Sequence, residues 1–335
     1  MDAELSPREF QLLNSFQRGF PLKPRPFAAI GTQLGMREQE VIDTLQRWQD
    51  SGVVSRVGAV FRPNAIGASA LAALAVPVKR IDTVAKIVNG FAEVNHNYER
   101  EHRFNLWFVV AAPSSQRLHE VLAAIEKACA CGPVLVLPML EDYHIDLGFD
   151  LANGAGTAPL HGPIWKLTPA HPSFTLDASE QEVLAALQDG LPIVERPFAC
   201  LGVPEEEAIA IITRWLDDGL VKRFGVVVRH HELGYGANAM VVWDVPESDV
   251  GRVGRRIAAS GRVTLCYRRE RRMPEWRYNL FCMIHGKDRA DVEARIADLI
   301  AACDMNEYPH DVLFSRRRFK QRGARYAPVT GAVHG

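Results

Sequence analysis

The sequence predicts an α+β fold made of two copies of one module, each a winged helix-turn-helix followed by a ferredoxin-like βαββαβ domain. The first observation is a repeat in register. The segment around Trp48 reads VIDTLQRWQDSGVVSRVGAVFRP, and the segment around Trp215 reads AIAIITRWLDDGLVKRFGVVVRH. The same spacing relates Gly58 to Gly225, and so many identities in register do not arise by chance. The second observation is that each copy changes from helical to strand periodicity along its length.

Composition places the chain among globular proteins. Its 335 residues fit two domains or four small ones, and 47% hydrophobic with 24% charged residues is a typical balance. No stretch approaches the run of about 20 apolar residues that crosses a bilayer, and the N-terminus lacks the pattern of a signal peptide. We therefore expect a cytoplasmic protein. A formal net charge of −1 lacks the basic excess that is usual in DNA-binding proteins.

Each copy is expected to begin with a helix-turn-helix. Apolar residues at helical spacing follow a capping residue, Ser6 in the first copy and Asp177 in the second. The third helix of each copy ends at a glycine, Gly52 or Gly219, which suits the left-handed residue after a helix. Wing strands are expected to follow. The winged helices are predicted over residues 1–62 and 173–229, with wing strands at 53–61 and 220–228.

The second part of each copy follows the order strand, helix, strand, strand, helix, strand, which is the ferredoxin-like split βαβ. An open sheet of this kind leaves an apolar face, so the two sheets should pack face to face as a pseudo-dimer. A segment rich in Gly, Ala and Pro between the copies indicates a linker. The predicted elements are residues 70–78, 83–89, 94–100, 105–111, 116–130 and 134–145 in domain 63–150, and residues 237–245, 249–259, 263–269, 278–285, 289–302 and 307–314 in domain 230–326, with a linker at 151–172 and a tail at 327–335.

A winged helix joined to a ferredoxin-like domain resembles the Lrp/AsnC regulators, and two long motifs resemble one branch of that superfamily. Residues 94–109 read VNHNYEREHRFNLWFV, and residues 263–286 read VTLCYRRERRMPEWRYNLFCMIHG. They resemble the two subunit types of siroheme decarboxylase, here fused in one chain as in proteins of the haem d1 pathway. The resemblance covers residues 5–325.

This resemblance implies the reaction and its participants. The enzyme would remove CO2 from the acetate side chains at C12 and C18 of siroheme, giving 12,18-didecarboxysiroheme for haem d1 or for an alternative route to haem. No cofactor is expected, because the siroheme iron belongs to the substrate. A homodimer, or association with other subunits of the haem d1 pathway, is compatible with the resemblance.

A row of polar residues in the first copy is the strongest chemical signal. Decarboxylation needs a cation for the carboxylate and a proton donor, for which histidine is the usual residue near neutral pH. Residues at i and i+2 of a strand share a face, so we predict His96, Tyr98, Arg100 and His102 as catalytic residues on one face. Alternating polar residues also occur on any half-exposed sheet, so a structural role stays open. Because the second copy has Leu265 where the first has His96, we expect one competent site, with histidines from copy one and part of the arginine rim from copy two; activity at both pseudo-symmetric sites stays an open alternative.

A substrate with eight carboxylates needs an apolar slot and several guanidinium groups, whose planar fork binds carboxylates bidentately. The second copy has basic clusters at residues 268–272 and 316–325. Such runs are usually solvated, and a capping role for Asn105 or a structural role for His144 is an open alternative. With six cysteines but no C-x-x-C pair, no metal site is expected. The predicted substrate-binding residues are Trp107, Asn105, His144, Arg268, Arg269, Arg271, Arg272, Trp276, Tyr278, Arg316 and Arg318.

Two other functions are compatible with the architecture. A DNA-binding regulator would need basic or neutral side chains at the start of its recognition helix, but the third helix of copy two begins with Glu205, Glu206 and Glu207. These carboxylates would repel phosphates, so we expect no DNA binding. The second alternative is a tetrapyrrole sensor without catalysis, which would return its ligand unchanged.

Overall fold

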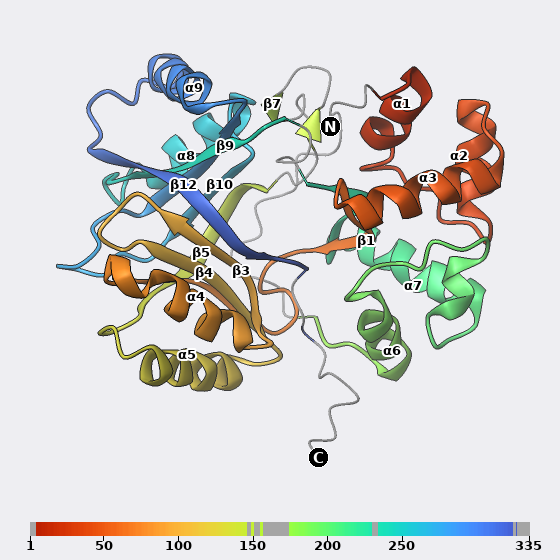
Figure 1. The fold of residues 1–335 in the computed structure, drawn as a ribbon, viewed down its shortest axis with the longest axis horizontal. Coiled ribbons are helices and arrows are strands. Elements are labelled where there is room, and N and C mark those ends of the chain that lie inside the picture. Colours follow the sequence, from red (N-terminus) through yellow and green to blue (C-terminus); the bar gives the residue numbers. More distant parts are fainter. Residues whose placement is uncertain are drawn as a thin grey trace. The chain divides into compact units, whose positions relative to one another are not determined.

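The computed structural model describes residues 5–145, 149–150, 155–156, 174–229, 234–323 and 326 (Figure 1). It divides into two compact units: residues 1–66, 168–233 and 326–335 form the first, and residues 67–167 and 234–325 form the second. Each unit therefore combines one part of each copy. Of the predicted linker, the structure describes only residues 155–156, which pair with residues 149–150 as β7 (Ala155–Gly156) and β6 (Phe149–Asp150). The predicted tail lies outside the described residues.

The first unit contains the two helix-turn-helix segments. Ser6 and Asp177 cap their first helices in capping boxes, as predicted. The second helix of copy two is reduced to a 3-10 turn. Copy one forms α1 (Pro7–Ser15), α2 (Pro26–Leu34), α3 (Glu38–Ser51) and β1 (Val54–Phe61), and copy two forms α6 (Ala178–Leu187), η2 (Pro197–Cys200), α7 (Glu205–Asp217) and β8 (Val221–Val228).

The wing strands pair between the copies. β1 and β8 form an antiparallel two-stranded sheet in which Gly58 lies opposite Gly225. The segment after the first helix of each copy then contacts the wing strand of the other copy. The Val226 N–H of β8 donates to Phe16 O at 2.8 Å, and the Leu191 N–H donates to Val57 O of β1 at 2.7 Å. This close approach of backbones explains the glycines in the repeat.

Replacing Gly225 by alanine tests this docking. The added Cβ would lie 2.7 Å from Gln17 O and closer still to Phe16 O, and backbone atoms cannot move aside cheaply. We expect Gly225→Ala to lower the free energy of unfolding by about 1–3 kcal/mol, measured by thermal and urea denaturation. Gly90→Ala is the control, because a Cβ there has no neighbour within 4 Å. Equal stability of the two variants would contradict the docking.

The second unit contains both ferredoxin-like domains, in the predicted βαββαβ order. Helices α4 (Ile81–Gly90) and α5 (Ser115–Cys129) cover one sheet, and α8 (Val250–Ala259) and α9 (Arg289–Ala302) cover the other (Figure 1). No helix in the described part of the chain is long and apolar enough to span a membrane. Copy one forms β2 (Ala68–Leu74), η1 (Val78–Arg80), α4 (Ile81–Gly90), β3 (Val94–Arg100), β4 (Leu106–Ala112), α5 (Ser115–Cys129) and β5 (Leu135–Ile145), and copy two forms β9 (Ala237–Trp243), α8 (Val250–Ala259), β10 (Leu265–Arg269), β11 (Leu280–Gly286), α9 (Arg289–Ala302) and β12 (His310–Gln321).

Exchanged strands join the two sheets into a closed barrel of the order β10-β11-β9-β12-β3-β4-β2-β5. The first half of β12 pairs with β9 of its own copy, and its second half pairs with β3 of the other copy. β5 likewise pairs with β2 and with β10. The predicted pseudo-dimer is confirmed. Its sheets also meet edge to edge, which leaves no open strand edge.

The direction of the strands fixes which residues share an end of the barrel. Neighbouring strands all pair antiparallel, so strands four places apart, such as β3 and β10, run in the same direction. The N-terminal ends of β3 and β10 therefore lie at one end of the barrel, and the turns after them lie at the other. The buried apolar side chains of the interior are Leu71, Ala73, Phe104, Trp107, Leu135, Leu137, Met139, Met240, Val242, Tyr267, Trp276, Phe281, Met283 and Leu313.

Candidate functional site

The predicted polar row lies on the inner face of β3. His96 pairs with Val109 of β4, and Tyr98 pairs with Trp107, which belongs to the interior cluster. Directly opposite residues of an antiparallel pair share a face, so both side chains face the interior. Between them, Asn97 faces outward and donates to the carbonyl of Ala85 on α4 at 3.2 Å. The expected common face is therefore present along β3.

His102 does not belong to this row, so the prediction of four aligned residues is wrong. β3 ends at Arg100, and the chain turns before His102. The His102 Nδ1 atom accepts a hydrogen bond from the Phe104 N–H at 3.0 Å, and its Nε2 atom lies 3.9 Å from Asp311 Oδ2. An imidazole that accepts at Nδ1 carries its proton on Nε2. Burial lowers the pKa of His102, and the Asp311 carboxylate opposes this only in part, which favours the neutral ring.

The exchanged strand β12 adds residues of copy two beside this row. Arg318 pairs with Tyr98, and Gln321 pairs with His96. The Arg318 guanidinium donates to Gln321 Oε1 at 3.2 Å, and the His96 and Tyr98 rings stack with centroids 6.3 Å apart. We call these four residues the His96 cluster. His96, Tyr98 and Gln321 are partly exposed and Arg318 is exposed, so the cluster is accessible at the end of the barrel where β3 begins.

The matching positions of copy two carry different side chains. Leu265 replaces His96 and pairs with Ile145 of β5, and Tyr267 pairs with Asp142. An imidazole and a guanidinium on one side of the barrel therefore correspond to an aliphatic side chain and a carboxylate on the other. Both sets lie at the same end of the barrel, because β3 and β10 run in the same direction. Sequence reasoning found the loss of the imidazole but missed Gln321 and Asp142, which only the strand exchange brings to these places.

Two arginines lie deeper in the interior at matching positions. Arg100 and Arg269 are 7% and 8% exposed. The Arg100 Nη1 donates to Leu313 O at 3.0 Å, and the Arg269 Nη1 donates to Leu137 O at 2.5 Å. Each guanidinium also lies near the ring of the tyrosine two residues before it, 5.7 Å and 4.6 Å from the ring centroids. Among the residues that the structure describes, neither arginine forms an ion pair with a carboxylate.

Burial makes these charges costly. It lowers the pKa of Arg100 to about 10 and also lowers the pKa of Arg269, while nearby tyrosine hydroxyls offset the effect only in part. A guanidinium does not lose its proton near neutral pH, so both groups remain charged. Since each tenfold change in proton affinity is worth about 1.4 kcal/mol, keeping Arg100 charged costs the folded protein on the order of 3 kcal/mol.

Trp276 closes the opposite end of the barrel. The turn between β10 and β11 is longer than the one between β3 and β4, and it places Trp276 in the interior cluster with 1% of its surface exposed. Its ring contacts His102 and Trp107 edge to face, with centroids 5.4 Å and 5.2 Å apart. The interior is therefore sealed at this end and partly exposed at the end of the His96 cluster.

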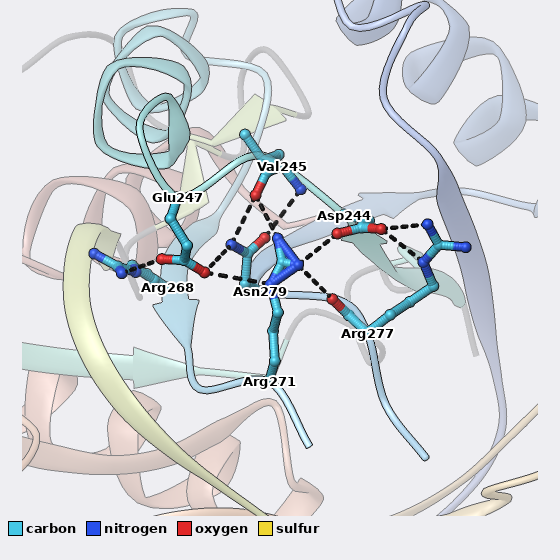
Figure 2. Close-up of polar contacts among 7 residues, drawn as sticks. All are labelled: Asp244, Val245, Glu247, Arg268, Arg271, Arg277 and Asn279. Atoms are coloured by element: carbon cyan, nitrogen blue, oxygen red, sulfur yellow. Dashed lines mark hydrogen bonds and ion pairs between the residues drawn. The ribbon is translucent and has the colours of Figure 1, made fainter. Parts of the chain in front are cut away.

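Two carboxylates hold this longer turn in place (Figure 2). Asp244 binds Arg271 Nη1 and Arg277 Nε, each at 2.6 Å. Glu247 pairs with Arg268 and lies 3.3 Å from Arg271 Nε. Arg268 and Arg271, predicted as substrate ligands, thus bind carboxylates of their own chain. Their placement identifies them as anchors of the turn.

The two matching asparagines have the structural role left open above. Asn105 Oδ1 accepts from the Val76 N–H at 2.8 Å, and its Nδ2 donates to Val76 O at 2.9 Å. Asn279 makes the same pair of bonds with Val245, at 3.1 Å and 2.9 Å. Both amides therefore fix the backbone that follows the first strand of their domain.

His144 does not face the cavity predicted for it. It pairs with Cys266, whose side chain lies in the core that α8 and α9 cover. Opposite residues share a face, so His144 lies on the helix side of the sheet. A bulge after Cys266 in the β5–β10 pairing causes this shift, and bulges cannot be located from the periodicity that predicted the strand.

The remaining predicted ligands are bound within the chain. Arg272 donates to Val136 O at 2.9 Å and pairs with Glu270 at 2.9 Å. Arg316 lies 3.4 Å from Glu101. The Tyr278 hydroxyl donates to Asp311 at 2.8 Å, and burial together with this carboxylate raises the pKa of Tyr278 to about 12. Of the predicted arginines, the structure brings Arg318 to the His96 cluster and Arg100 with Arg269 to the interior.

This fold and site define a protein with two ligand-binding domains of the AsnC type and two helix-turn-helix segments. The family model for the AsnC-like ligand binding domain matches residues 65–144 and 232–320. The family model for the siroheme decarboxylase NirDL-like HTH domain matches residues 9–54 and 180–221.

Curated relatives and solved structures agree with these matches. The siroheme decarboxylase NirDL subunit of Paracoccus denitrificans is 44% identical over 96% of this chain and 98% of that protein. The siroheme decarboxylase of Hydrogenobacter thermophilus is 31% identical over 94% of each chain. A crystal structure of the siroheme decarboxylase NirDL in co-complex with an iron-uroporphyrin III analogue is 28% identical, with a TM-score of 0.65 and coverage of 96% of this chain and 94% of that one. The chain belongs to the siroheme decarboxylase family.

The anchoring of the longer turn can be tested with Asp244→Asn. This change removes the charge that holds Arg271 and Arg277, so we expect faster amide exchange in residues 270–278, measured by hydrogen–deuterium exchange mass spectrometry. Asp249→Asn is the matched control, because Asp249 pairs only with the exposed Arg252 in the ion pairs of the described chain. Unchanged exchange in Asp244→Asn would show that Asp244 does not hold the turn.

Proposed function

We propose that this enzyme is a carboxy-lyase that acts on siroheme, removing CO2 from the acetates at C12 and C18 to give 12,18-didecarboxysiroheme. The observation that supports it most is the His96 cluster, which joins an imidazole of copy one to a guanidinium of copy two at the accessible end of the barrel. Membership in the siroheme decarboxylase family supports the substrate. The protein needs no cofactor of its own in this proposal, because the iron is part of the substrate.

The chemistry requires one bond to break and one proton to arrive. The bond between the acetate CH2 and its carboxylate carbon breaks, CO2 leaves, and the electron pair delocalises into the conjugated macrocycle. A proton then converts the CH2 carbon to a methyl group. The protein has to position the carboxylate, limit water around it and supply the proton.

His96 is the better proton donor of the two candidate histidines. Its Nδ1 lies 3.0 Å from Asn95 Oδ1, an acceptor that an Nδ1–H satisfies whether the ring is neutral or protonated. Proton exchange at Nε2 therefore leaves this bond intact. His102 would have to lose the Phe104 hydrogen bond to become protonated, and its partly buried position opposes the charge.

The two sides of the barrel differ in the charge that they place beside the interior tyrosine. Arg318 offers a cation to a substrate carboxylate beside Tyr98, whereas Asp142 at the matching place beside Tyr267 would repel one. Reaction at the His96 cluster alone follows from this difference. In other organisms related sequences are separate NirD, NirL and NirH subunits, and we include association with such subunits, or with a second copy of this chain, in the proposal.

The decisive experiment is anaerobic incubation of the purified protein with siroheme, followed by mass spectrometry of the tetrapyrrole. Loss of two CO2 units supports the proposal in full. Loss of one indicates that a subunit is missing or that one acetate is not a substrate. Siroheme that binds but returns unchanged would identify a sensor, and absence of binding would contradict a tetrapyrrole function.

His96→Gln tests the proton donor. We expect kcat for siroheme decarboxylation to fall at least about 100-fold, with siroheme affinity retained, because glutamine keeps the size and polarity of the side chain. Leu265→Gln, at the matching position of copy two, is the control. We expect it to keep kcat within about threefold of the unaltered protein, because a leucine there supplies no acid or base. Full activity of His96→Gln on both acetates would exclude this assignment.

Arg318→Ala tests the cation that copy two supplies. We expect KM for siroheme to rise several-fold, up to about tenfold, with a smaller change in kcat, because an exposed guanidinium contributes modestly to carboxylate binding. The effect should shrink as salt is raised. Arg295→Ala, which removes an arginine that pairs with Asp291 on α9, should leave KM unchanged. An unchanged KM in Arg318→Ala would remove this residue from the site.

A further inference from the structure

Arg100 and Arg269 lack what buried cations normally have. Buried charges in proteins are paired or coordinated, since taking an ion out of water without a partner is costly. These two lie in an apolar interior, at matching positions on β3 and β10, and neither has a carboxylate partner in the described chain. Folding would be easier with two apolar side chains there, so the charges require another explanation.

Their hydrogen bonds leave donors unused. A guanidinium carries five N–H donors. The bonds of Arg100 go to Leu313 O and, at 3.9 Å, to Met283 Sδ, and the backbone bond of Arg269 goes to Leu137 O. The Nε of Arg269 is buried without a partner. A backbone carbonyl with the Met283 sulfur for Arg100, or with the Tyr267 side chain for Arg269, supplies no negative charge, whereas a carboxylate would neutralise the cation and satisfy several donors at once.

We propose that Arg100 and Arg269 together form a carboxylate-binding site inside the barrel, which holds a side chain of the tetrapyrrole that does not react. The inference rests on the proposed function and extends it to the orientation of the substrate. β3 and β10 run in the same direction, so both arginines lie at the same depth from the accessible end. The site combines one residue of each copy, which the shared barrel brings to the same depth.

Depth along the strand separates this site from the reacting group. Arg100 follows His96 by four residues, which at about 3.3 Å per residue places the two roughly 13 Å apart along β3. A carboxylate bound at Arg100 is therefore a different one from the acetate at His96. A rigid macrocycle held at this second point has a fixed orientation, which decides which acetate reaches the imidazole.

The sealed end of the barrel strengthens such a site. Trp276 and Trp107 are 1% and 2% exposed, so water does not reach the arginines from that side. Charge-assisted hydrogen bonds are stronger where water is excluded. The same exclusion makes the empty site costly to the protein, and this cost gives the proposal a distinctive test.

The experiment compares Arg269→Met and Arg269→Lys with the unaltered protein. Siroheme affinity is measured by anaerobic absorbance titration, and the melting temperature is measured with and without siroheme. We expect Arg269→Met to bind siroheme at least about tenfold more weakly, yet to melt without ligand at the same temperature as the unaltered protein or higher. Arg269→Lys should recover part of the affinity, because it keeps the charge but not the planar fork.

Arg223→Met is the matched control in the first unit. Arg223 is also buried, but its Nη1 binds two backbone carbonyls, Gln17 O at 2.6 Å and Val226 O at 3.1 Å. We expect this variant to melt at a lower temperature and to keep siroheme affinity. An Arg269→Met variant that melts lower, fails to fold or keeps full affinity would overturn the inference. If the unaltered protein itself does not bind siroheme, that result would overturn the proposed function instead.

Discussion

The exchange of the last strand of each ferredoxin-like domain is the constraint on which the rest of the second unit depends. β12 leaves its own sheet halfway along its length and continues beside β3, while β5 does the same beside β10. Backbone hydrogen bonds thereby close the barrel and fix the register between the copies. A slip of one residue would turn every side chain of β12 to the other face. The register therefore decides that Arg318, and not Arg317, faces inward beside Tyr98.

Closure of the barrel also explains how two similar domains can have different roles. The exchanged strands pair in the same way at both sides of the barrel, down to the buried arginine that binds a carbonyl of the exchanged strand. Only side chains differ: His96 against Leu265, and Arg318 against Asp142. Gene fusion allows such divergence, because a homodimer must place the same residue at both positions. The longer turn of copy two, anchored by Asp244 and Glu247, adds a second difference at the other end.

The sequence predicted the architecture well because the spacing of apolar residues follows the periods of helix and strand, and the repeat shows that both copies share them. It predicted the two winged helices, both βαββαβ domains and the pseudo-dimer, and the alternation along residues 94–100 placed His96, Tyr98 and Arg100 on one face. It misplaced His102 and His144 for local reasons: β3 ends at Arg100, and a bulge shifts His144. For the basic clusters, residue type was a poor guide. Arg268, Arg271 and Arg316 looked like substrate ligands, but nearby carboxylates bind them, and no spacing rule in the sequence reveals Asp244 or Glu101 as their partners.

In the helix-turn-helix segments, charged residues likewise form ion pairs within the chain. Glu38 and Glu205, which open the third helices, pair with Arg25 and Arg196 from the preceding Arg-Pro-Phe segments. These carboxylates are thus part of the turn between the second and third helices, where acidic residues also favour a helix N-terminus. A helix that begins in this way cannot present those positions to a phosphate backbone without loss of affinity. Absence of DNA binding stays a prediction, and its physical basis is that the first carboxylate of each third helix, Glu38 or Glu205, is bound by an arginine of the same helix-turn-helix.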